Sequence, residues 1–108
     1  MEKGEIWLTN LPQIIGKEQI GKRPALVIAD TKTSLVIIIP LTSNMETLKY
    51  PNTIKIKPSK INALNKESAA LIFQMRAVDK GRIVHKIGNL EQEYMDHINK
   101  NLKELLKI

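Results

Sequence analysis

The chain has 108 residues, enough for one compact domain and too few for two independent cores, so we expect residues 1–108 to form a single domain. It has no cysteine, which excludes disulfides, Cys-based zinc sites and Cys nucleophiles. Aromatic residues make up only 4%, which argues against a single-strand-binding module built on rows of stacked bases. The first residues show no signal-peptide pattern, and we expect a cytoplasmic protein.

The charge balance is the first pointer to a partner. Lysine and arginine number 17 against 11 for aspartate and glutamate, giving a formal net charge of +6. A small domain this basic suits a polyanion such as nucleic acid. Many soluble domains carry modest positive charge without binding a polyanion, so charge alone leaves both interpretations open.

Short segments rich in β-branched residues predict strands along most of the chain. In order, the predicted strands are residues 5–10, 24–30, 34–41, 53–57, 69–74 and 82–85. Residues 11–22 contain Pro and Gly breakers and predict a long connection. In the fourth strand, Ile54 and Ile56 alternate with Lys55 and Lys57, which predicts a half-buried strand with a basic outer face.

From Leu90 onward the apolar spacing is that of a helix. Its stripe consists of Leu90, Tyr94, Met95, Ile98, Leu102, Leu105 and Leu106. We expect Asn89 to be the N-cap. Many short strands followed by one terminal helix predict a mainly β fold, a small barrel closed by the helix.

Few residues carry recognisable chemistry. Arg23 precedes the proline that opens the second strand, so we expect it at a loop-to-strand junction, where a guanidinium can contact a phosphate or simply be solvated. Thr42 and Ser43 follow an apolar strand, where hydroxyls cap a turn or donate to a ligand. His85 and His97 are isolated, and no cluster has metal-ligand spacing, so we expect no metal and no cofactor.

Five stretches of the chain, in order, resemble the MazF/PemK family of toxin endoribonucleases. They are GEIWLTNL at residues 4–11, GKEQIGKRPALVI at 16–28, VIIIPLTSN at 36–44, ESAALIFQMRAVDKGRI at 67–83 and IGNL at 87–90. The EQ-x-G-x-RP-x-L-V-I element together with P-L-T-S makes the resemblance specific. It covers nearly the whole chain.

The resemblance implies an SH3-like barrel with a C-terminal α-helix, assembled as a homodimer and neutralised by a MazE-like antitoxin. It implies metal-independent, sequence-specific cleavage of single-stranded RNA. The catalytic pair of the family maps onto Arg23 and Thr42. We further assign RNA contacts to Lys17, Gln19, Lys22, Ser43 and Gln74.

Some positions depart from the family pattern. A plasmid-borne branch has a catalytic Arg and Asp where this chain has Leu71 and Phe73, so its acid–base scheme cannot be transferred. The family's Q-x-R-x-x-D element is kept as Gln74, Arg76 and Asp79, and we expect it to position the loop or dimer contacts. Without a protein nucleophile, we expect the 2′-hydroxyl of the RNA to attack the adjacent phosphorus. Arginine is a poor general base, and the sequence assigns no other.

Two other functions share the expected fold. Gyrase-targeting toxins related to CcdB resemble this barrel, but they place target-binding residues, including a Trp, at the end of the terminal helix, where this chain has none. A non-catalytic nucleic-acid-binding barrel is supported only by charge. If the protein is a toxin of the first kind, we expect RNA and an acidic antitoxin tail to share a surface formed by the basic loop at residues 17–23 together with Lys55 and Lys57.

Overall fold

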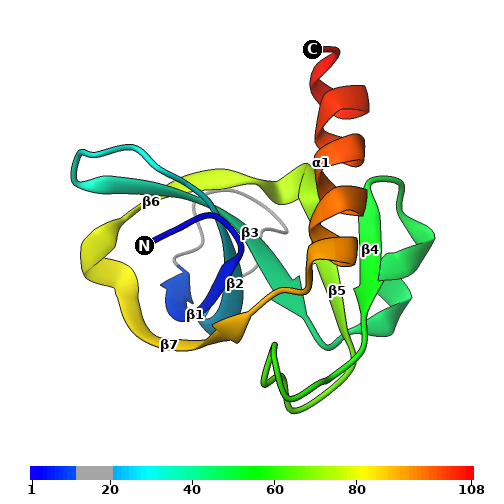
Figure 1. Ribbon diagram of the computed structural model, residues 1–108, viewed down its shortest axis with the longest axis horizontal. Helices are drawn as coiled ribbons and strands as arrows, with labels where there is room; N and C mark the ends of the chain where they lie inside the picture. Colours follow the sequence, from blue (N-terminus) through cyan, green and yellow to red (C-terminus); the bar gives the residue numbers. More distant parts are fainter. Residues whose placement is uncertain (12–20) are drawn as a thin grey trace.

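The computed structural model describes residues 1–11 and 21–108, and within these ranges the chain forms seven strands, three short 3₁₀ helices and one C-terminal α-helix (Figure 1). The elements, with 3₁₀ helices labelled η, are β1 (Glu5–Leu11), β2 (Gly21–Asp30), β3 (Leu35–Thr42), η1 (Met45–Lys49), β4 (Thr53–Ile56), β5 (Ser68–Leu71), η2 (Ile72–Gln74), β6 (Arg76–Asp79), η3 (Lys80–Arg82), β7 (Ile83–Asn89) and α1 (Gln92–Leu106). The expected mainly β fold with a C-terminal helix is confirmed.

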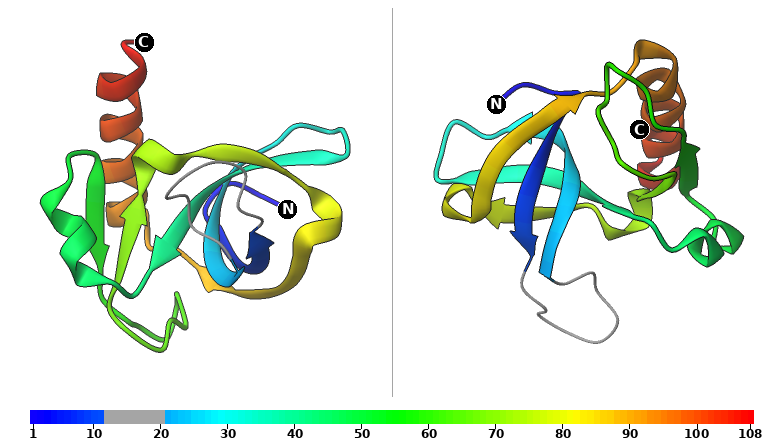
Figure 2. Two further views of the ribbon diagram at one scale, coloured as in Figure 1. Left: turned by 180° about the vertical axis from the view of Figure 1, so that it is seen from behind. Right: turned by 90° about the horizontal axis from the view of Figure 1, so that it is seen from below.

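The strands form one antiparallel sheet in the order β4-β5-β3-β2-β1-β7, and β6 also pairs with β3. One edge of β3 pairs with β6 through residues 35–38 and with β5 through Leu41 and Thr42. The sheet curls so that β7 arches beside β1 (Figure 2). Within the described residues its end strands, β4 and β7, are not paired with each other, so the expected barrel is open.

Apolar side chains fill both faces of the central strands, which explains their continuous apolar runs. Side chains alternate along a strand. On β2, Leu26 points into a core shared with α1, while Ala25 and Val27 point into a second core inside the curled sheet. The second core also contains Leu11, Val36, Ile38 and Val78.

The terminal helix packs on the sheet through the predicted stripe. Met95, Ile98 and Leu102 are buried in the larger core, as the spacing predicts. Leu105 and Leu106 are exposed, because the last turns of α1 project away from the sheet (Figure 1). Among residues 1–11 and 21–108, no helix is long and apolar enough to cross a membrane.

The predicted N-cap of this helix is wrong. Glu91 is the N-cap, and Asn89 is the last residue of β7. The backbone N–H of Asn89 donates to the carbonyl of Ile61 at 3.0 Å, and that of Leu90 donates to the carbonyl of Gly4 at 2.8 Å. These long-range bonds keep the chain extended up to the helix.

Several strand boundaries also differ from expectation. β2 begins at Gly21, so Arg23 lies inside a strand and not at a loop-to-strand junction. β5 ends at Leu71, and a turn of 3₁₀ helix follows where a continuous strand was expected. β6 was not predicted, since its four residues carry only one buried side chain, Val78. β7 runs to Asn89, four residues beyond the predicted end at His85.

Candidate active site

A cavity of about 590 Å³ lies between the start of β2, the middle of β7 and the loop at residues 57–67. Its polar and charged lining includes Lys22, Arg23, Ser43, Lys66, His85 and Lys86. Lys22 also lines a second hollow of about 480 Å³, together with Arg82. Asp79 lines this second hollow too, so Lys22 is the cation that the two hollows share.

The register of three neighbouring strands assembles the cavity. Leu8 on β1 lies opposite Pro24 on β2 and opposite His85 on β7. Directly opposite residues of antiparallel strands project their side chains to the same face. All three line the cavity, so the sheet brings His85 to the same wall as the residues that begin β2.

Arg23 lies at the cavity wall, as its predicted role requires. Its side chain is half-buried, and it lines the cavity beside Lys22. A guanidinium can donate two parallel hydrogen bonds to a phosphate. The half-buried position on a strand limits the directions in which the Arg23 guanidinium can point.

Thr42 is the last residue of β3 and is buried, with 4% of its surface exposed. Its hydroxyl oxygen accepts a hydrogen bond from the backbone N–H of Asn44 at 3.2 Å, so the turn-capping role is present. That bond uses an oxygen lone pair and leaves the hydroxyl proton for donation. Its neighbours Leu41 and Ser43 line the cavity, whereas Thr42 does not.

The other predicted RNA contacts divide into three groups. Lys22 and Ser43 line the cavity. Gln74 lies at the end of η2 and does not line it. Lys17 and Gln19 lie outside the described residues.

The expected basic face of β4 is partly neutralised. Lys55 Nζ lies 3.2 Å from Glu67 Oε2, and both side chains are nearly half exposed. Lys57 follows the end of the strand and is also exposed. Neither lysine lines the cavity.

Three titratable cavity residues were not predicted as site residues: Lys66, His85 and Lys86. His85 and Lys86 are neighbours in the sequence, and strand pairing and the path of the 57–67 loop bring them together with Lys66. The positive composition was a signal for the two lysines. The sequence showed His85 beside Lys86 but gave no indication that Lys66 lines the same cavity.

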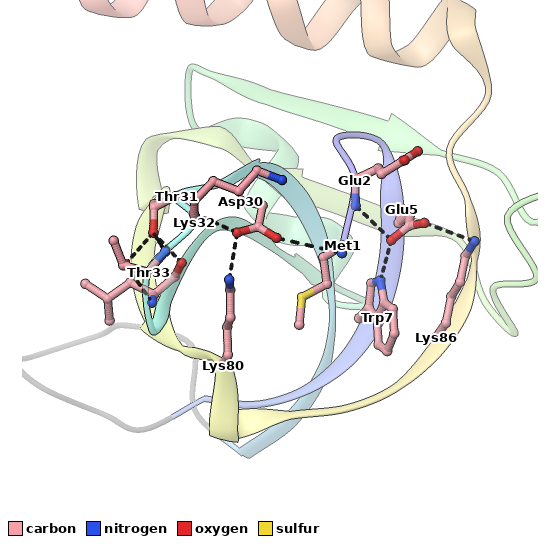
Figure 3. Close-up of polar contacts among 11 residues, drawn as sticks. Met1, Glu2, Glu5, Trp7, Asp30, Thr31, Lys32, Thr33, Lys80 and Lys86 are labelled. Atoms are coloured by element: carbon pink, nitrogen blue, oxygen red, sulfur yellow. Dashed lines mark hydrogen bonds and ion pairs between the residues drawn. The ribbon is translucent and has the colours of Figure 1, made fainter.

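Lys86 is held in place by Glu5. Its Nζ lies 3.2 Å from Glu5 Oε2, while Glu5 Oε1 accepts from the Trp7 indole N–H and the Glu2 backbone N–H, each at 3.0 Å (Figure 3). The Glu2 backbone bond is the largest cause of a lowered Glu5 pKa, followed by the Trp7 bond. Glu5 is therefore a fixed anion that positions Lys86.

The cavity suits an anionic ligand. In the described part of the chain, its lining contains lysines, an arginine and a histidine but no aspartate or glutamate. A concave cationic surface attracts phosphodiesters. Within the same ranges, no group of three or more His, Cys, Asp or Glu residues is placed to hold a metal ion.

Sequence comparisons identify related proteins over nearly the full chain. A family model described as a PemK-like, MazF-like toxin of type II toxin-antitoxin systems matches residues 2–106. The chain is 29% identical over 107 residues to endoribonuclease EndoA of Bacillus subtilis (strain 168), covering 95% of this chain and 91% of that protein. It is 31% identical over 103 residues to endoribonuclease MazF of Staphylococcus saprophyticus, covering 92% of this chain and 85% of that protein.

Solved structures share the fold. MazF from Deinococcus radiodurans has a TM-score of 0.83 at 24% identity, covering 100% of this chain and 97% of that one. An endoribonuclease from a mycobacterial species, in complex with its cognate antitoxin, has a TM-score of 0.71 at 18% identity, covering 98% and 92%. The open sheet with its terminal helix is thus an arrangement found in solved structures.

Proposed function

The chain belongs to the PemK-like, MazF-like toxin family of type II toxin-antitoxin systems, and we propose that it is an endoribonuclease with its active site in the cavity around Arg23. One observation carries the proposal. The arginine of the family's RP element lines a cavity whose charged side chains, in the described residues, are all basic. Both named relatives are endoribonucleases. No observation favours the gyrase-targeting alternative.

The proposed reaction is transesterification of single-stranded RNA. The substrate's 2′-hydroxyl oxygen forms a bond to the adjacent phosphorus while the bond from phosphorus to the 5′ oxygen breaks. The hydroxyl proton leaves to a base, and the departing 5′ oxygen takes up a proton. The products are a 2′,3′-cyclic phosphate and a 5′-hydroxyl, and no metal takes part.

Arg23 and Thr42 stabilise the charge that develops on the phosphate. The Arg23 guanidinium donates to the non-bridging oxygens. Thr42 donates its hydroxyl proton to the same phosphate, since its oxygen is already held by the Asn44 N–H. Donors fixed before the reaction lower its barrier most effectively. Thr42 is buried and does not line the cavity, so this contact requires the substrate to reach between Leu41 and Ser43, which do.

The bound RNA follows the basic residues. Lys22 and Ser43 contact it in the cavity, and Lys22 leads toward the second hollow. Lys17 and Gln19 are assigned the same role from the sequence. A contact at Gln74 requires RNA that extends beyond the cavity toward η2.

We also propose the biological setting of the enzyme. It acts as a homodimer of single-domain chains in the cytoplasm, where its RNA substrate is found. A MazE-like antitoxin neutralises it, as membership of a toxin-antitoxin family implies. The acidic tail of such an antitoxin would compete with RNA for the basic cavity.

The test is incubation of purified protein with a mixed RNA, with and without EDTA, beside a gyrase supercoiling assay. We expect cuts restricted to short sequences that persist in EDTA. Arg23→Ala protein serves as the control for contaminating nucleases. Intact RNA together with inhibited supercoiling would support the gyrase-targeting alternative and overturn this proposal.

A further inference from the structure

The proposed reaction needs a group that accepts the 2′-hydroxyl proton, and neither member of the predicted catalytic pair is suited to that role. Arginine and lysine are already protonated at neutral pH, and a neutral threonine hydroxyl is a weak base. This inference rests on the proposed function and concerns which cavity side chain takes the proton.

His85 is the one imidazole among the described residues that line the cavity. Four cations accompany it: Lys22 and Arg23 on β2, Lys66 on the 57–67 loop and Lys86 on β7. The opposing residue on β1 is the apolar Leu8, and the Glu5 carboxylate on the same strand is paired with Lys86. Imidazole is the side chain whose protonation changes most readily between about pH 5 and 8.

A backbone hydrogen bond orients the ring. His85 Nδ1 lies 3.2 Å from the carbonyl oxygen of Lys86. A carbonyl oxygen only accepts, so in the neutral ring this bond assigns the proton to Nδ1. Nε2 then carries the lone pair. The side chain is exposed, so a substrate in the cavity can reach that nitrogen.

We propose that His85 is the general base of RNA cleavage. Nε2 accepts the proton of the 2′-hydroxyl as the oxygen bonds to phosphorus, and the bond to the 5′ oxygen breaks. The leaving oxygen takes a proton from water, and the resulting hydroxide is neutralised by the proton that His85 releases. The enzyme and the number of protons are restored at the end of each cycle.

The chain supplies its own matched control. His97 is the other of its two histidines and is also exposed, but it lies on α1. It lines a separate hollow with Glu93, Asp96 and Lys100. Replacing His97 therefore tests for any general effect of losing a histidine.

The experiment measures single-turnover cleavage of RNA between pH 5 and 9 for wild type, His85→Ala and His97→Ala. We expect the wild-type and His97→Ala rates to rise with pH and level off. We expect His85→Ala to be slower by about 10²–10⁴-fold and to lose the acidic limb of the profile. Added imidazole should restore part of the cleavage rate of His85→Ala, in proportion to the concentration of neutral imidazole in the buffer. RNA affinity and thermal unfolding should change little.

Three results would overturn the assignment. If wild type cleaves and His85→Ala cleaves at the same rate with the same pH profile, His85 is not the base and the proposed function stands. If His85→Ala loses an alkaline limb instead, the residue donates a proton and the base lies elsewhere. If wild type itself leaves RNA intact, the proposed function fails, and this assignment fails with it.

Discussion

Arg23 on β2 lies directly opposite Thr9 on β1, and Thr9 is completely buried. The backbone at the proposed phosphate-binding residue is therefore fixed by the sheet, beside a residue that belongs to the interior. Sites built on strands hold their geometry more closely than sites on loops. The Arg23 side chain can be replaced without removing the backbone pairing between β1 and β2 that positions it.

Replacing Arg23 with Ala should separate activity from folding. We expect the cleavage rate to fall by about 10²–10³-fold, because one preorganised donor is lost. The free energy of unfolding should fall by less than about 1 kcal/mol, because the side chain is only half-buried. Single-turnover assays and urea unfolding measure the two effects. Lys100→Ala, which removes an exposed cation from α1, should leave both unchanged.

The Thr42 hydroxyl can be tested with two variants, a valine that matches threonine in size and a serine that keeps the hydroxyl. Thr42→Val removes the hydroxyl and leaves the Asn44 N–H without its acceptor. We expect a loss of about 10²–10³-fold in rate and of about 0.5–1.5 kcal/mol in the free energy of unfolding. Thr42→Ser should keep most of the cleavage rate and most of the free energy of unfolding. A Val variant that cleaves at the wild-type rate would exclude Thr42 from the reaction.

Gly88 allows β7 to lie against the loop that lines the cavity. A Cβ at this position would lie 2.6 Å from the backbone oxygens of both Ile61 and Asn62. These backbone atoms cannot move as a side-chain tip would, so Gly88→Ala should cost about 1–3 kcal/mol of stability. At Gly81 the nearest atom is a side-chain oxygen of Asp79 at 3.0 Å. Gly81→Ala should therefore destabilise less, and equal losses in urea unfolding would contradict this account.

Asp30 should contribute to the acid sensitivity of the fold. The Lys80 ammonium, 2.7 Å away, is the largest cause of an Asp30 pKa lowered to about 2 from its usual 3.8, followed by the Lys32 backbone N–H (Figure 3). A carboxylate with a lowered folded-state pKa stabilises the fold above pH 3.8. That contribution is lost as the pH falls from about 4 to about 2.

Thermal unfolding measured from pH 5 to pH 2 tests this contribution. The melting temperature of wild type should fall more steeply than that of Asp30→Asn. Lys80→Met removes the main cause of the shift and should flatten the slope in a similar way. Parallel curves for all three proteins would show that the pair has no role in acid unfolding.

Antitoxin and RNA should exclude each other from the cavity. Both affinities should fall with added salt, and that of RNA more steeply, because condensed counterions are released from its backbone. A competition titration with a fragment of the cognate antitoxin measures this. If a saturating fragment leaves RNA affinity unchanged, the antitoxin does not occupy the RNA site.

The sequence predicted those features whose signals are local. The helical stripe through Met95, Ile98 and Leu102 and the apolar runs of the central strands depend on short-range periodicity, and both are confirmed. The N-cap was wrong because bonds from Asn89 and Leu90 to distant backbone carbonyls keep that segment extended. Such bonds leave no trace in a local pattern.

The same distinction holds at the candidate site. Arg23 and Ser43, which line the cavity, were assigned to the site from motifs that are continuous in the sequence. His85 and Lys66 were missed because strand register and loop path bring them to the cavity from far along the chain. Thr42 was correctly considered as a turn cap, since hydroxyls at strand ends commonly have that role.

The most direct test of the central claim is the chemistry of the cleaved ends. An RNA oligonucleotide containing a mapped cut site and a DNA strand of the same sequence are each incubated with the protein in EDTA. The account predicts that only the RNA is cut, leaving a 2′,3′-cyclic phosphate and a 5′-hydroxyl, and that Arg23→Ala greatly slows the reaction. Cleavage of the DNA strand, or RNA products that carry a 5′-phosphate, would contradict it.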